Sequence, residues 1–256
     1  MKSIIVCADD YGMSQEVDDA ILELIEKKRI SATSCMTLMP NWKSSANRLK
    51  ELEGQAAFGL HFDLGHVASL GKLMLSAVLR TLDKSAIETT LNQQLDNFEN
   101  EMSRAPDYID GHQHVHAFPV IRDVLASVVN QRYAVETPWI RRPSVPLTGH
   151  DSALKAVVIQ GLNLGFDSVI GKHTDAQTNS SFAGLYSISE TANFPELMEG
   201  WVNNLDNHGL IMCHPAVEGA NVEHSLARIK EYDYLRSDRY ISYLEANNVT
   251  LVTHPE

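Results

Sequence analysis

The chain has 256 residues, a mass of 28.5 kDa and a formal net charge of −12 with a pI near 5.3, so it is expected to repel nucleic-acid backbones and anionic membrane surfaces. A hydrophobic content of 44% supplies a full globular core. No run approaches the roughly 18 apolar residues of a membrane span, and acidic residues follow the first short apolar run too closely for a secretory signal. Three scattered cysteines are too few for a disulfide framework, so we expect a cytoplasmic protein.

The first 61 residues alternate between strand and helix patterns. The apolar run Ile4–Ala8 predicts a buried strand that ends at Asp9-Asp10, where Tyr11-Gly12 breaks it. Ser14 is placed as the N-cap of a helix whose apolar residues recur at helical spacing through Ile25. The next predicted elements are a strand over Thr33–Met39, a helix over 42–52 and a strand over Ala56–His61.

The middle of the chain begins with a stretch that lacks a clear period. Residues 62–84 are interpreted as a loop on the substrate side, because loops of this length are uncommon unless they are functional. Ser85-Ala86-Ile87-Glu88 has the form of a capping box, which predicts the start of a long helix. A strand over Asp107–His112, a helix over 119–132 and a strand over Val135–Arg141 follow.

The remaining elements complete an α/β pattern. Residues 143–184 are less regular and include a predicted helix near 152–163 and a predicted short strand at Ser168–Ile170. The last predicted elements are a helix over 194–207, a strand over Leu210–His214, a helix over 225–247 and a strand over Val249–Thr253. This alternation predicts an α/β fold of seven or eight mainly parallel strands with right-handed crossovers, in one domain over residues 1–256.

Four predicted strands end in residues that can bind a metal or transfer a proton: Asp9-Asp10, His61, the run from Asp110 to His116, and His214. In an α/β barrel these strand ends meet at one face, where the chemistry occurs. Within the run, every second residue would lie on one side of an extended segment: Asp110, His112, His114 and His116. Three histidines in five residues are hard to explain as core packing, because each buried imidazole needs hydrogen-bond partners.

One Asp with two His ligands leaves an open coordination position and suits Zn²⁺ or another divalent ion. With a second carboxylate as base and a His as acid, such a set can hydrolyse an amide or ester. The sequence has no Gly-x-Ser-x-Gly elbow and no dinucleotide- or nucleotide-binding glycine motif. A metal-storage or sensing site stays open, as does a glycosidase that uses Asp9 and Asp110 as paired carboxylates, although the latter leaves the histidines unused.

The motifs resemble those of the YdjC-like carbohydrate deacetylases, which include the chito-oligosaccharide deacetylases. The resemblance runs from residue 4 to about residue 250 and rests on four motifs in order: Ala8–Ser14, Gly59–Leu64, Asp110–His116 and Cys213–Pro215. It implies a distorted (β/α) barrel with one divalent metal ion, Mg²⁺ or Zn²⁺, that removes acetyl groups from N-acetylated mono- or oligosaccharides. The segments 62–84 and 143–184 differ from characterised members and would line the sugar site, which leaves the sugar open.

The resemblance also implies roles for individual residues. The metal ligands would be Asp10, His61 and His112. Asp9 would be the general base, His214 the acid that protonates the leaving amine, and Arg141 the residue that orients Asp9, with Arg142 as the competing position. The substrate-side or supporting residues would be His114, His116, Tyr11 and Asp63.

Two other classes of protein stay open. One is a different metal-dependent hydrolase on a similar barrel, of the amidohydrolase or phosphoesterase type, in which His114 and His116 would be the ligand pair. The other is a non-catalytic sugar- or metal-binding protein. The expected partner is a small N-acetylated saccharide, with no nucleic acid or membrane, and the sequence leaves a homodimer open.

Overall fold

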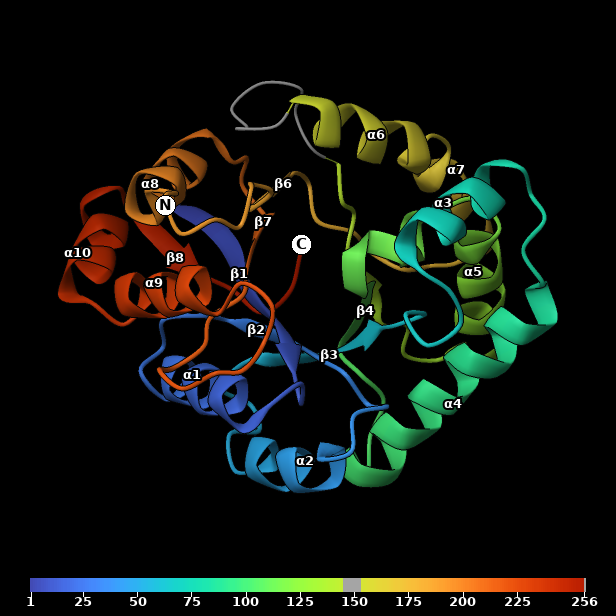
Figure 1. The fold of residues 1–256 in the computed structure, drawn as a ribbon, viewed down its shortest axis with the longest axis horizontal. Helices are drawn as coiled ribbons and strands as arrows, with labels where there is room; N and C mark the ends of the chain where they lie inside the picture. Colours follow the sequence, from blue (N-terminus) through green and yellow to red (C-terminus); the bar gives the residue numbers. More distant parts are fainter. Residues whose placement is uncertain (145–152, 256) are drawn as a thin grey trace.

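The computed structural model describes residues 1–144 and 153–255. Its described strands form one sheet in the order β5-β4-β3-β2-β1-β7-β6, with β8 paired to the start of β1. All of these pairings are parallel, and the helices form a ring around the curled sheet (Figure 1). The predicted α/β class and the number and direction of the strands are confirmed.

The strands of the described residues are β1 (Lys2–Tyr11), β2 (Ala32–Cys35), β3 (Ala57–Phe62), β4 (Tyr108–Gly111), β5 (Trp139–Ile140), β6 (Phe182–Ala183), β7 (Gly209–Cys213) and β8 (Val249–Leu251). The helices are α1 (Gln15–Glu26), α2 (Trp42–Lys50), α3 (Leu70–Val78), α4 (Lys84–Met102), α5 (Ile121–Arg132), α6 (Ala153–Asn163), α7 (Phe166–His173), α8 (Phe194–Asn204), α9 (Ser225–Leu235) and α10 (Asp238–Ala246), with a 3₁₀ helix η1 (His112–Ala117) after β4.

The sheet curls as a barrel does, but its two edges are joined by single hydrogen bonds instead of a strand ladder. The backbone N–H of Ile140, in β5, donates to the Gln177 carbonyl at 2.9 Å. The buried Asn179 side chain accepts from the Arg142 N–H at 2.7 Å and donates to the Ser181 carbonyl at 2.9 Å, just before β6. The barrel is therefore distorted in that its edge strands β5 and β6 are not paired with each other.

Both faces of the strands are buried, which explains why they are apolar runs in the sequence. Inside the barrel lies a small core that includes Tyr108 and Trp139, whose rings stack with centroids 4.1 Å apart. Two larger apolar clusters pack between the outer face of the sheet and the surrounding helices. The helices therefore cover the outside, and the polar strand ends are left at the mouth of the barrel.

The segment 62–84, predicted as a loop, contains the helix α3. Its inward residues Leu70, Leu73, Met74 and Ala77 do follow helical spacing. The outward residues Leu75, Val78 and Leu79 are also apolar and are 61%, 63% and 62% exposed. Because apolar residues lie on both faces of this helix, the helical period of the inward residues could not be recognised in the sequence. The prediction of a loop was wrong over α3.

Three other predictions were wrong at the level of single elements. Ser168–Ile170 lies inside the helix α7, which packs Phe166 and Ile170 into the core, and is not a strand. The predicted helix 225–247 breaks into α9 and α10, because the Ser237 hydroxyl accepts from the Tyr240 N–H and caps a new helix. The capping box at Ser85 is replaced by Asp83, whose carboxylate accepts from the N–H groups of Ser85 and Ala86.

Several strands are shorter than predicted. The strand predicted over Val135–Arg141 forms only at Trp139–Ile140, because Pro138 has no N–H for the ladder. The strand predicted from Thr33 ends at Cys35 and not at Met39. Among the described residues, no helix combines the length and apolarity needed to cross a membrane.

Candidate active site

A cavity of about 620 Å³ opens where the carboxyl ends of β1, β3 and β7 and the turn after β4 come together. Its polar lining includes Asp9, Asp10, His61, His112 and His214. The residues predicted from the strand ends therefore do meet at one place. Both irregular segments of the sequence also reach it, through Leu70 and Met74 of α3, Val158 and Leu162 of α6, and Gly184.

The backbone at Asp10 explains how two neighbouring carboxylates face one cavity. β1 continues to Tyr11, so the predicted strand end at Asp10 was wrong. Instead, Asp10 has a left-handed φ of 73°, and the pairing of β1 with β2 shifts register between Ala8 and Tyr11. A non-glycine residue held in this region costs about 1 kcal/mol or more, and such strain concentrates at functional sites.

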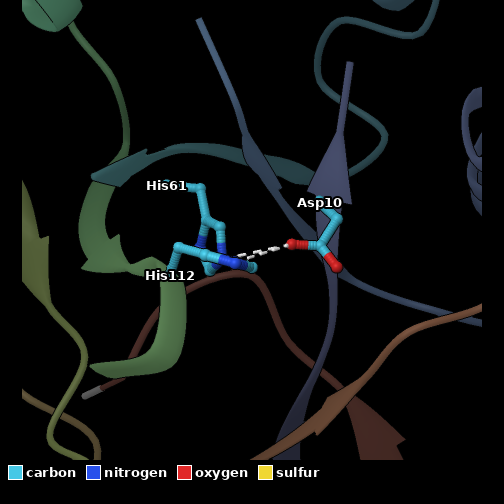
Figure 2. A group of neighbouring side chains, drawn as sticks. All are labelled: Asp10, His61 and His112. Atoms are coloured by element: carbon cyan, nitrogen blue, oxygen red, sulfur yellow. Dashed lines mark hydrogen bonds and ion pairs between the residues drawn. The ribbon is translucent and has the colours of Figure 1, made fainter. Parts of the chain in front are cut away.

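Asp10, His61 and His112 form a compact set of potential metal ligands (Figure 2). The Asp10 Oδ1 atom lies 3.2 Å from His112 Nδ1 and 3.4 Å from His61 Nε2, and one ligand atom from each residue falls within 4.8 Å of the others. Burial alone would raise the pKa of the Asp10 carboxyl, but hydrogen bonds from His112 and His61 and the Arg228 charge hold it well below its usual range. The carboxylate is therefore ionised and ready to bind a cation.

Asp110 fixes the orientation of His61. Its Oδ1 lies 2.6 Å from His61 Nδ1, while its Oδ2 accepts from Ser34 Oγ at 2.5 Å. This leaves Nε2 of His61 directed at Asp10. Burial alone would lower the pKa of His61, but the charges of Asp110 and Asp9 and the carboxylate hydrogen bonds raise it to about 10. A carboxylate behind a ligand histidine fixes its tautomer and raises its basicity.

Asp9 is held by a buried arginine. Arg141, with no exposed surface, donates from Nη1 to Asp9 Oδ2 at 2.7 Å and from Nη2 to Asp9 Oδ1 at 2.6 Å. The same Nη2 lies 2.5 Å from Asp110 Oδ2. Burial opposes ionisation of Asp9, but the Arg141 charge and hydrogen bonds lower the pKa of its carboxyl well below the usual range. Arg142 instead pairs with Asp167 at 2.6 Å on the surface.

Cys7, Asp9 and Asp110 also bring three potential ligand atoms close together. The Arg141 guanidinium already occupies the space between them, with Nη2 at 2.9 Å from Cys7 Sγ. Burial raises the pKa of the Cys7 thiol, so it stays protonated beside the Arg141 cation. This second cluster is therefore a buried ion-pair network around Asp9, and the Asp10 cluster is the better candidate for a metal site.

His214 faces Asp9 from the end of β7. Its Nε2 lies 4.0 Å from Asp9 Oδ2, and its backbone N–H donates to Glu231 Oε2 at 2.5 Å. Burial lowers the pKa of His214 to about 4, with the nearby Arg228 charge acting in the same direction, although Asp10 and Asp9 oppose the shift. This lowered pKa favours the uncharged imidazole at neutral pH.

The helix α9 supplies two site residues that the sequence analysis missed. Arg228 donates from Nη2 to Asp10 Oδ2 at 2.6 Å, and the buried Glu231 accepts hydrogen bonds from the Tyr186 hydroxyl and the His214 backbone. Burial raises the pKa of Glu231 to about 7. The two residues are three positions apart and share the buried face of the helix. That spacing of two charges among apolar residues was the available signal.

The predicted one-sided arrangement of Asp110, His112, His114 and His116 is wrong. Gln113 and His114 have φ values of 55° and 60°, which turn the chain into a 3₁₀ helix directly after β4. His114 still lines the cavity and meets Phe182 edge-on at 5.4 Å. His116 is fully buried, with Nε2 2.8 Å from the Arg141 carbonyl that follows β5, and it does not belong to the described lining of the cavity.

The structure also places Tyr11 and Asp63 away from the described cavity lining. The fully buried Tyr11 hydroxyl donates to the Ser45 carbonyl at 2.7 Å, pointing outward into the packing around α2. The Asp63 carboxylate accepts from the Gly65 N–H at 2.8 Å and closes a local turn. Neither belongs to the described lining of the cavity.

Two alternatives from the sequence lose support. The ligand pair His114 and His116 does not occur among the metal-ligand groups of the described residues. The paired carboxylates of a glycosidase would be Asp9 and Asp110, but Asp110 is fully buried behind His61 and does not line the cavity.

Comparison with known proteins gives a consistent result. A family model described as YdjC-like protein matches residues 3–246. A chitooligosaccharide deacetylase of Proteus mirabilis is 31% identical over 142 residues, which cover 50% of this chain and 56% of that protein. A carbohydrate deacetylase of Clostridium beijerinckii is 22% identical over 267 residues, and the alignment covers 97% of each chain.

Solved structures share the fold. A protein of Enterococcus faecalis V583 named for cellobiose-phosphate cleavage has a TM-score of 0.71 and 17% identity, over 98% of this chain and 97% of that chain. A peptidoglycan N-acetylglucosamine deacetylase has a TM-score of 0.54 and 13% identity, over 99% of this chain and 86% of that chain. At these identities the likeness is one of fold alone.

Proposed function

The chain belongs to the YdjC-like family, and on that premise we propose that it is a metal-dependent hydrolase that removes the acetyl group from an N-acetylated mono- or oligosaccharide. The relatives named as chitooligosaccharide and carbohydrate deacetylases support this reaction class. One observation carries the proposal. A single cavity contains the Asp10, His61 and His112 cluster and, beside it, a separate carboxylate, Asp9, that a buried arginine keeps ionised.

The residues present fit a divalent ion. Asp10, His61 and His112 would hold it, with Asp110 behind His61 and Arg228 on the second oxygen of Asp10. Two imidazoles and one carboxylate suit Zn²⁺ better than Mg²⁺, which prefers a shell of oxygens. When bound, such an ion lowers the pKa of a water ligand and polarises a carbonyl oxygen.

Asp9 is the proposed general base. Both of its oxygens accept from Arg141, which fixes the plane of the carboxylate. Oδ1 also lies within hydrogen-bond distance of Cys7 Sγ and Ser34 Oγ, so Oδ2 is the oxygen better placed to take a proton. The lowered pKa keeps Asp9 ionised at neutral pH, so it can take a proton from the attacking water.

His214 is the proposed proton donor to the leaving amine. It is uncharged at the start, and its Nε2 lies 4.0 Å from Asp9 Oδ2. The proton that Asp9 removes from water can therefore pass to His214 and on to the amine nitrogen as the amide C–N bond breaks. One water is consumed, and acetate and the amino sugar leave. His114, on the cavity wall, is the proposed contact to the sugar.

The test is to measure acetate and new primary amine together. N-acetylglucosamine and its β-1,4-linked dimer and trimer are incubated with the protein and one divalent ion at a time. We expect equal amounts of acetate and amine, because amide hydrolysis produces both, whereas ester hydrolysis produces acetate alone. A metal-loaded sample that releases no acetate from the panel would contradict the proposal.

A further inference from the structure

We propose that the amino sugar accepted by this cavity carries an alkyl chain, which lies along a wall formed by α3 and α6. The inference rests on the proposed function and names the class of substrate. The alkyl chain can belong to either end of the substrate, as an N-acyl group longer than acetyl or as an alkyl group on the glycosidic oxygen. Both present the same run of methylene groups to the wall.

The cavity lining contains two chemically different sets of residues. The groups that can bind metal or move protons come from the ends of β1, β3 and β7, from η1 and from α9. The apolar set includes Leu70 and Met74 of α3, Val158 and Leu162 of α6, and Phe118, and all of these except Val158 pack in one apolar cluster. Among the lining residues that the structure describes, α3 and α6 contribute only these four, and none has a hydroxyl, amide or charged group.

A wall of this kind discriminates between a second sugar ring and an alkyl chain. A hydroxyl pressed against it loses its hydrogen bonds to water and gains none, which weakens binding by about tenfold or more for each hydroxyl. A methylene group covered by the same side chains strengthens binding by about fourfold. The wall therefore favours an apolar extension of the substrate over a sugar unit rich in hydroxyls.

The aromatic residues of the lining do not offset this preference. A sugar ring can stack its C–H face on an exposed aromatic ring, which provides a large rigid contact. In the described part of the lining, Phe118 and Tyr186 are only 2% and 4% exposed. The Tyr186 hydroxyl already donates a hydrogen bond to Glu231. Neither ring presents an open face to a second sugar, whereas Met74 and Val158 are accessible.

The test compares kcat/KM for three glycosides in the metal-loaded enzyme. The reference is methyl N-acetylglucosaminide. One arm replaces the methyl group with hexyl, and the other keeps the methyl group and replaces N-acetyl with N-hexanoyl. We expect at least one arm to exceed the reference by about 30-fold or more, since several covered methylenes at about fourfold each suffice. The arm that gains identifies the end that carries the chain. If both arms stay within threefold of the reference, the proposal is wrong.

Two neighbouring residues of α3 supply a matched pair of variants. Met74 lines the cavity, and Leu75 points to solvent at 61% exposure. Met74→Asn should abolish most of the gain from the alkyl chain, measured against the methyl reference in the same variant, while Leu75→Asn should leave that gain at the wild-type value. Equal effects of the two variants would contradict a chain bound inside the cavity.

A binding measurement separates this inference from the proposed reaction. Hexyl and methyl glucosaminide, and hexanoate and acetate, are titrated into the protein by calorimetry, so that no turnover is needed. If hexyl glucosaminide binds about 30-fold or more tightly than methyl glucosaminide, or hexanoate than acetate, the result supports the alkyl wall even if no acetate is released from any substrate. Equal affinities within both pairs overturn it, even if the enzyme deacetylates the reference sugar.

Discussion

Replacing Arg141 with Lys tests whether this buried guanidinium holds the base. Arg141 donates two parallel hydrogen bonds to Asp9, at 2.7 and 2.6 Å, and lies 2.5 Å from Asp110. A Lys ammonium is a single point and cannot span both Asp9 oxygens while it also reaches Asp110. At least one charged hydrogen bond is lost in a fully buried site, so the free energy of unfolding should fall by about 1.5–3 kcal/mol. Arg141→Met, which removes the cation, should cost about 3–5 kcal/mol.

The adjacent residue provides the control. Arg142 pairs with Asp167 at 2.6 Å, but the two side chains are 32% and 58% exposed. Arg142→Lys should therefore change the free energy of unfolding by less than about 1 kcal/mol. Urea unfolding of the three variants and the wild type at pH 7 gives the values by linear extrapolation. If Arg141→Lys and Arg142→Lys cost the same, the buried network does not hold Asp9 as the structure indicates.

Further predictions address the base, the ligands and the buried acid. Asp9→Asn cannot accept a proton, so turnover should fall by about 100-fold or more while the metal content, measured by atomic spectroscopy, stays at the wild-type level; loss of the metal would make Asp9 a ligand instead. His112→Ala should weaken metal binding by more than the roughly 10–100-fold that follows loss of a supporting partner. His224 lines the same cavity but is 45% exposed and lies outside the ligand cluster, so His224→Ala should leave metal binding unchanged. Equal weakening in the two metal titrations would refute the ligand assignment. Because the pKa of Glu231 is raised from 4.5 to about 7 in the folded chain, its contribution to stability is complete below pH 4.5 and is lost as the pH rises towards 7, by up to about 1.4 kcal/mol per pH unit. Glu231→Gln should lack this component, so the difference in unfolding free energy between wild type and variant should shrink or change sign between pH 5 and 7; a constant difference would contradict the raised pKa.

The strands that reach the site could be predicted because parallel strands buried on both faces are continuous apolar runs. Ile4–Ala8 and Leu210–Cys213 are of this kind, and the polar residues that follow them do meet at the barrel mouth. The two-residue strands β5 and β6 were not identified with these boundaries. Pro138, which limits β5, is visible in the sequence, but the hydrogen bonds between Asn179 and Arg142 that join the two edges are contacts distant in sequence.

The candidate ligands and base could be predicted because each lies at or directly after the carboxyl end of a strand, and strand ends converge by topology. Arg228 and Glu231 were missed. Their spacing indicates that they share one helix face, but that this face reaches the site depends on how α9 docks against the barrel. The failure of the parity argument at His114 and His116 has a local cause. It assumed extended backbone, whereas two successive left-handed residues turn the chain sharply after Gly111.

The most direct test of a metal-dependent deacetylase is acetate release as a function of bound metal. Metal-free protein, prepared with a chelator, is titrated with Zn²⁺ while acetate from an N-acetylated glucosaminide and the ions bound per chain are measured in the same samples. The cluster of Asp10, His61 and His112 predicts a rate that rises in proportion to occupancy and saturates at about one ion per chain. Metal-free protein that releases acetate at the rate of the loaded protein would contradict it.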